Sequence, residues 1–112
     1  MDSRFLTGAV DMLILDVLSR GDSYGYQISQ TVMSQSDGYF ELKEGSLYPA
    51  LHRLERQKML KAYWVEPEEG RRRKYYKLTA KGRKTLEERR ENWRNFSQAV
   101  NGVLGGQHRV LA

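Results

Sequence analysis

Four basic residues follow one another at Arg71-Arg72-Arg73-Lys74, the longest basic run in the chain. The wider segment 71–94 carries eleven basic and three acidic side chains, a net charge of +8, whereas residues 1–42 carry two basic and six acidic, a net charge of −4. A localised basic block indicates a polyanionic partner, with nucleic acid first and an anionic membrane second. Taken alone, such a run is equally typical of a solvated surface.

A second group of polar residues occupies an expected helix that begins near Gly45-Ser46. Its apolar strip at Leu47, Leu51 and Leu54 faces inward, so the remaining side chains point outward. Hydroxyl and imidazole groups hydrogen-bond phosphates or base edges, arginine binds guanine bidentately, and proline can contact a thymine methyl group. With the basic run, the candidate DNA-contacting residues are Tyr24, Lys43, Ser46, Tyr48, Pro49, His52, Arg53, Arg71, Arg72 and Lys74.

Other chemistry finds little support. The chain has no cysteine, and its two histidines, His52 and His108, are far apart in the sequence. There is no phosphate-cradling glycine motif and no clustered set of metal ligands. Glu68-Glu69 beside Pro67 is more simply a polar turn than an acid/base pair. We therefore expect that the protein is not an enzyme and that it binds neither a metal nor a cofactor.

The composition limits the class of protein. The 112 residues, 39% hydrophobic and 29% charged, fit one globular domain that gains from burying further apolar surface between subunits. No signal-peptide pattern opens the sequence, and the apolar stretch 9–18 is interrupted by Asp11 and Asp16, so it is too short and too charged for a bilayer. The expected location is the cytoplasm, on the bacterial nucleoid, without membrane contact.

The elements that position these groups follow from periodicity. We expect helices at about 7–19, 24–35, from 45 onward and 80–104, with strands at 60–65 and 73–78 forming a hairpin. Asp22 or Ser23 is expected to cap the second helix and Thr79 the last one. Phe40 and Leu42 suggest a short extended segment, and Gly82 should be a mild weak point of the last helix.

This order predicts a mainly α fold with a small β-hairpin: a winged helix-turn-helix followed by a long C-terminal dimerisation helix. The expected division is a DNA-binding domain over 1–79, a dimerisation helix over 80–106 and a flexible tail over 107–112. In the last helix two series of apolar residues spaced by seven form a seam, with Arg89 at an imperfect position. Packing onto its own domain is the alternative. The expected dimer residues are Leu86, Trp93, Phe96, Val100 and Val103.

Three separated motifs resemble the PadR family of transcriptional regulators. They are DSYGY at 22–26, GSLYPALHRLE at 45–55, and GRRRKYYKLT at 70–79 followed by Gly82. The resemblance covers roughly residues 8–82. It implies a winged-helix fold, a homodimer and repression of nearby operons, often those for detoxification or drug export. Larger members carry a multi-helix C-terminal domain; this chain has room for one helix and is similar to the short subfamily.

Trp93 suggests how such a regulator could respond to a ligand. In a symmetric dimer two Trp93 rings could face one another across the two-fold axis and prop the helices apart. The resulting slot, bounded by Met12, Trp93 and Phe96, would suit a planar aromatic or cationic small molecule. The alternative is that Trp93 only fills the interface core.

Two other functions remain open at this point. A winged-helix protein–protein adaptor would carry a basic wing with no role in duplex binding. An RNA-binding protein is disfavoured because side chains cannot read the deep, narrow major groove of A-form RNA. For duplex DNA, the expected partner of the homodimer is an imperfect palindrome whose half-sites lie about one helical turn apart, or a multiple of it.

Overall fold

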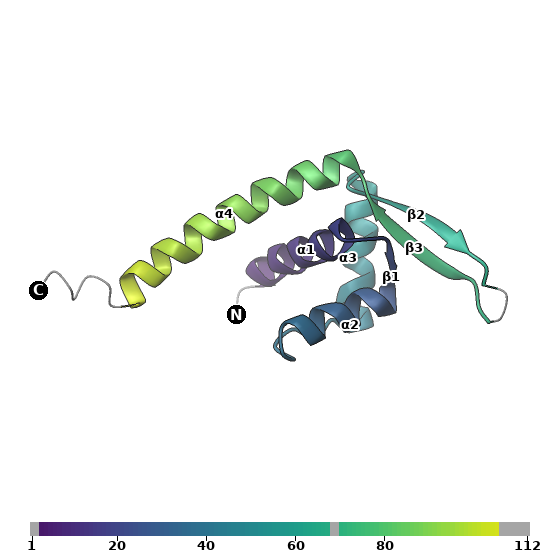
Figure 1. Cartoon of the computed structure of the whole chain (residues 1–112), viewed down its shortest axis with the longest axis horizontal. Helices are drawn as coiled ribbons and strands as arrows, with labels where there is room; N and C mark the ends of the chain where they lie inside the picture. The colour runs from purple at the N-terminus through teal and green to yellow at the C-terminus, as the bar shows by residue number, and fades with distance from the viewer. Residues whose placement is uncertain (1–2, 68–69, 106–112) are drawn as a thin grey trace, which may run out of the picture.

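The computed structural model describes residues 3–67 and 70–105, with side chains from residue 8 onward. The expected tail at 107–112 and the turn residues Glu68-Glu69 lie outside this part. The described residues form four helices and three strands, arranged with the hairpin and the end of the last helix at opposite ends of the molecule (Figure 1). The elements are α1 (Ser3–Ser19), β1 (Ser23–Tyr24), α2 (Gly25–Gln35), α3 (Glu44–Arg56), β2 (Leu60–Val65), β3 (Arg73–Leu78) and α4 (Ala80–Leu104).

The core lies where α1, α2 and α3 meet the base of the hairpin. Helix α1 contributes apolar side chains from more than one face, as its sequence predicts. The stripes expected on α2 and α3 are also inside. Each fully buried side chain of this size stabilises the fold by roughly 1.5–3 kcal/mol. The side chains buried most completely are Ile14, Leu15, Ile28, Leu51, Leu54, Tyr76 and Leu86.

The hairpin forms with the expected strands and gains a third. β2 and β3 pair antiparallel from Leu60 opposite Leu78 to Val65 opposite Arg73. β1 pairs with the other edge of β3, so the strand order is β1-β3-β2. Strand β1 could not be predicted from the sequence, because two residues are too few to show a period of two.

The start of α2 differs from the expected cap. Tyr24, not Asp22 or Ser23, is the N-cap residue, and its side chain makes no capping hydrogen bond. Asp22 instead accepts a hydrogen bond from the Tyr63 hydroxyl at 2.5 Å. The expected extended segment near Phe40 forms no strand, although Leu42 is buried and Phe40 packs partly against the core.

Helix α4 begins in the core and then leaves it. Thr79 caps it as expected, accepting the Gly82 amide at 3.0 Å. Leu86 is 1% exposed within its own protomer, so its assignment to the dimer interface was wrong. The helix then passes α1 and continues beyond it (Figure 1). None of the described helices is both long enough and apolar enough to cross a membrane.

Candidate nucleic-acid interface

A cleft of about 350 Å³ separates α3 and the start of α2 from the hairpin, hereafter the wing. The basic run and the exposed face of α3 therefore meet at one concave surface. Five of the expected DNA-contacting residues line this cleft: Tyr24, Tyr48, His52, Arg72 and Lys74. Five further lining residues are absent from the expected set: Gly25, Tyr26, Trp64, Arg73 and Tyr76.

The close crossing of α2 and α3 depends on Gly25. A Cβ atom at this position would lie 2.7 Å from the Tyr48 hydroxyl and 3.1 Å from the ring carbon that carries it. The glycine therefore gives the Tyr48 ring its place at the beginning of α2. The ring stays 38% exposed there, so it both packs at the helix-turn-helix crossing and borders the cleft.

The wing cations are held by aromatic rings. The Arg72 guanidinium lies over the Trp64 ring at 4.6 Å, and its Nε atom is 3.2 Å from Glu66. The Arg73 guanidinium lies over the Tyr24 ring at 4.5 Å. A cation–π contact restricts a guanidinium while leaving its other face open to an anion. Arg71 is exposed in the loop just before β3.

Two further contacts fix the wing to the helices. Lys74 Nζ lies 3.8 Å from Glu55 in the last turn of α3. On the other face of the sheet, Tyr63 stacks on Tyr75 with ring centroids 5.8 Å apart. The hydrogen bond that the Tyr63 hydroxyl donates to Asp22 raises the pKa of Tyr63 above its ordinary value of 10.0. The phenol is therefore neutral, and this tether intact, throughout the physiological range.

Burial also raises the pKa of the Tyr76 hydroxyl, and the negative charge of Glu55 adds to the effect. Tyr76 lies on the cleft side of β3, where Lys74 Nζ is 5.6 Å from its ring centroid. The phenols of Tyr63 and Tyr76 are thus neutral groups. Phenolate anions in their place would weaken the positive potential of the wing.

The other expected residues on α3 do not all face the cleft. Ser46 and Pro49 are exposed and border a separate hollow beside Tyr39 and Phe40, and Lys43 is exposed as the N-cap residue. Arg53 lines the same hollow with its side chain 31% exposed, and its guanidinium is bound bidentately by Asp11 of α1 at 2.5 and 3.4 Å. This ion pair engages the guanidinium group that was expected to contact a base.

Arg56 is a basic residue that the sequence analysis left out. It is exposed in the last turn of α3, four residues after His52, and so lies on the same side of the helix. The i, i+4 spacing was visible in the sequence.

A second groove, of about 440 Å³, lies between α1 and α4. It brings together the three residues expected to border a ligand slot, Met12, Trp93 and Phe96. The Trp93 and Phe96 rings are 5.8 Å apart, and their side chains are about half exposed, at 46% and 53%. Gly8, Ala9, Arg89 and Asn92 complete the lining.

Comparison with known proteins identifies the family. Residues 14–88 match the transcriptional regulator PadR-like family. A transcriptional regulator of Mycobacterium tuberculosis is 32% identical, with 92% of this chain and 90% of that protein covered. The transcriptional regulator YqjI of Escherichia coli is 36% identical over 88% of this chain, which spans only 46% of that longer protein.

Solved structures agree with this result. A transcriptional regulator from Clostridium thermocellum superposes with a TM-score of 0.80 at 36% identity, covering 91% of this chain and 96% of that one. A PadR-like transcriptional regulator from Bacillus cereus gives a TM-score of 0.80 at 33% identity, covering 93% and 99%. The chain therefore belongs to the PadR-like family of transcriptional regulators and is not an enzyme.

Proposed function

We propose that this regulator binds duplex DNA as a homodimer and represses transcription, with detoxification or transport genes as its targets. The observation that carries the proposal is the cleft between α3 and the wing, where aromatic rings hold guanidinium groups beside the exposed face of a helix-turn-helix. A protein–protein adaptor has no need for cations placed in this way.

In this proposal α3 enters the major groove. Its exposed residues Ser46, Pro49 and His52 face base edges, and Arg56 is added to them. The wing lies along the flanking backbone, with Arg71 and Arg72 on phosphates or in a narrow minor groove. Tyr24, Lys43, Tyr48 and Lys74 border these surfaces and would contact sugar and phosphate groups. Arg53 is not included among the base readers, because its guanidinium is engaged by Asp11.

The far half of α4 supports the proposed homodimer. Trp93 and Phe96 expose large apolar surfaces on a helix that runs past its own domain (Figure 1). Covering them with a second copy of α4 would bury aromatic area and bring Val100 and Val103 into the same seam. The dimerisation segment then begins after Leu86, later than the expected boundary at residue 80. Two-fold symmetry would place the DNA-binding surfaces of the two subunits on the two halves of a palindromic operator.

The groove beside Trp93 supports a further part of the proposal, an effector. Its apolar floor and two aromatic rings suit a planar aromatic molecule, including a cationic one, seated between the subunits. Such a ligand would release DNA if it bound best to a dimer in which the spacing of the two DNA-binding surfaces does not match the spacing of the operator half-sites. Tryptophan fluorescence tests this part: ethidium should quench Trp93 in a Trp64→Phe protein free of DNA. Unchanged fluorescence at saturating ethidium would leave Trp93 as a packing residue.

DNA binding is tested with duplexes selected from a random library, using fluorescence anisotropy across a salt series. Arg71→Ala and Arg72→Ala should weaken binding to every duplex and each reduce the slope of log K against log salt by about one. Arg94→Ala removes the same charge from the far half of α4, where Arg94 pairs with Glu91 at 3.1 Å, and should leave the slope unchanged. Equal slopes for all three variants and the parent would contradict the assignment of the wing.

A further inference from the structure

A buried carboxylate joins three helices behind the reading surface. Asp11 of α1 is 6% exposed. Its Oδ1 atom accepts from Nη2 of Arg53 on α3 at 2.5 Å, and its Oδ2 atom accepts from Nε of the same residue at 3.4 Å. The Oδ2 atom also lies 3.9 Å from Nη1 of Arg89 on α4. One negative charge therefore serves a cation of the proposed recognition helix and a cation of the proposed dimerisation helix.

The two arginines differ in their hydrogen bonds to Asp11. Arg53 has two hydrogen bonds to Asp11, whereas Nη1 of Arg89 is buried and has no hydrogen-bond partner among the described residues. A buried donor in this state gains from any small shift that brings it to an acceptor. The nearby acceptor is Asp11 Oδ2 at 3.9 Å, so a movement of α4 toward α1 would bring this oxygen within hydrogen-bond distance of Arg89.

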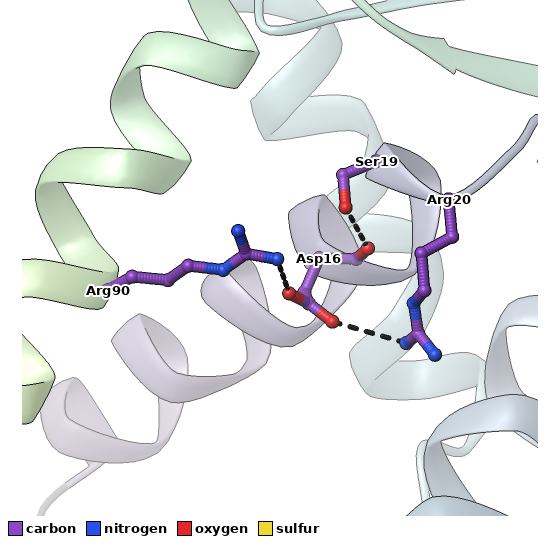
Figure 2. Close-up of polar contacts among 4 residues, drawn as sticks. All are labelled: Asp16, Ser19, Arg20 and Arg90. Carbon is purple, nitrogen blue, oxygen red and sulfur yellow. Dashed lines mark hydrogen bonds and ion pairs between the residues drawn. The ribbon is translucent and has the colours of Figure 1, made fainter.

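A second ion-pair cluster joins α1 to α4 without reaching α3. The Asp16 carboxylate binds Arg90 of α4 and, at 3.1 Å, Arg20 at the end of α1, as Figure 2 shows. The Ser19 hydroxyl donates to the Asp16 carbonyl oxygen at 2.6 Å. Arg89 and Arg90 are neighbours that each pair with a carboxylate of α1, and they differ in whether that carboxylate also holds α3.

We propose that Asp11 is a positioning residue through which the placement of α4 acts on α3. Arg89 and Arg53 compete for its carboxylate, so a change at α4 alters how firmly Arg53 anchors the recognition helix. Arg89 also lines the groove beside Trp93, which places one end of this link where an effector would bind. The consequence for DNA affinity rests on the proposed function; the link between the helices does not.

Hydrogen exchange of the full-length protein, measured by mass spectrometry without DNA, tests the link directly. Arg89→Gln should raise the protection of α3 amides by at least about threefold, the lower part of the range for directly coupled residues, because Arg53 no longer has to compete for the Asp11 carboxylate; lowered protection would contradict the competition. Arg90→Gln is the matched control and should alter α1 and α4 but leave α3 unchanged. If Arg89→Gln left α3 unchanged, or if both variants changed it equally, the proposal would be overturned.

A double-mutant cycle then separates positioning from a general loss of stability. In an Asp11→Asn background Arg89→Gln should have no further effect on α3, because the shared carboxylate charge is gone. If Asp11→Asn does not fold, Arg53→Gln supplies the same test, since it removes the α3 partner. An effect of Arg89→Gln that persisted undiminished in either background would show that Asp11 does not transmit it. A chain that fails to bind any duplex could still pass these tests, so the two proposals fail separately.

Discussion

Replacing Gly82 with alanine tests how closely α4 is packed against the wing. Gly82 lies in the first turn of α4, directly above the turn that ends α3 and begins β2. A Cβ atom at this position would overlap the carbonyl oxygen of Met59 and lie 2.7 Å from Cδ1 of Leu78. The Met59 carbonyl cannot move away freely, because it accepts the Thr79 amide at 3.1 Å. The expectation that Gly82 is a weak point of the helix was therefore incomplete, because this position requires a glycine.

Two opposing effects set the magnitude. Alanine is the better helix former, by up to about 1 kcal/mol in a helix interior. Forcing an extra methyl group into a packed site costs about 1–3 kcal/mol, and contact with backbone places Gly82 in the upper part of that range. Gly82→Ala should therefore lower the free energy of unfolding by about 1–2 kcal/mol. Gly45, in the first turn of α3, has nothing within 4 Å of its would-be Cβ, so Gly45→Ala should stabilise by up to about 1 kcal/mol.

Thermal unfolding followed by circular dichroism measures both variants. The comparison needs one protein concentration throughout, because the proposed dimerisation would make the Tm depend on concentration. For a domain of this size each kcal/mol shifts the Tm by roughly 4–8 °C. The two glycine-to-alanine changes should therefore move the Tm in opposite directions. If Gly82→Ala raised the Tm as Gly45→Ala does, the packing argument for this junction would be wrong.

Three other predictions concern single side chains. Because the pKa of Tyr63 lies above 10.0 in the folded protein, the stabilisation from its neutral hydroxyl is complete below pH 10.0 and is lost as the pH rises through the folded value. In a phenolate absorbance titration, Tyr63→Phe should therefore remove a component with a midpoint above pH 10.0. Loss of a component with a midpoint at or below pH 10.0 would contradict this prediction. Leu86→Ala should destabilise the protomer by about 2–5 kcal/mol in urea unfolding while changing the dimer dissociation constant little by sedimentation, whereas a weakened dimer of unchanged stability would return Leu86 to the interface. Gly25→Ala should displace the Tyr48 ring and lower DNA affinity in anisotropy titrations with only a small loss of stability, since a side chain and not backbone must move; unchanged affinity would show that Tyr48 has no part in the interface.

Elements with a repeating apolar pattern could be predicted from the sequence. The bounds expected for β2, β3 and α4 agree with the structure, and α1 and α2 differ only at their first residues. Each has several buried residues at the spacing of its own period, so local pattern and tertiary packing give the same answer. Strand β1 has no such pattern; it exists because Tyr24 meets Tyr75 on the edge of β3.

The candidate site could be predicted in composition more than in orientation. The pattern indicated that polar residues of α3 and basic residues of the wing work together, and the cleft brings them together. It could not indicate that Arg53 pairs with Asp11, because Asp11 lies 42 residues away and looks like a simple interruption of an apolar helix. The assignment of Leu86 to the dimer interface was wrong for a related reason. A spacing of seven residues does not distinguish the core of one protomer from a seam between two protomers.

The geometry of α4 explains why its two ends can affect one another. Gly82 and Leu86 fix its first turns in the core, and Trp93 begins its exposed part. Arg89 lies between them, one turn and about 6 Å before Trp93 at the usual rise per residue. A continuous helix transmits a tilt over such a distance with little bending. In the proposed link, a second subunit or a molecule in the groove would therefore act on the Asp11 carboxylate through Arg89, which lies 3.9 Å from it and lines the same groove as Trp93.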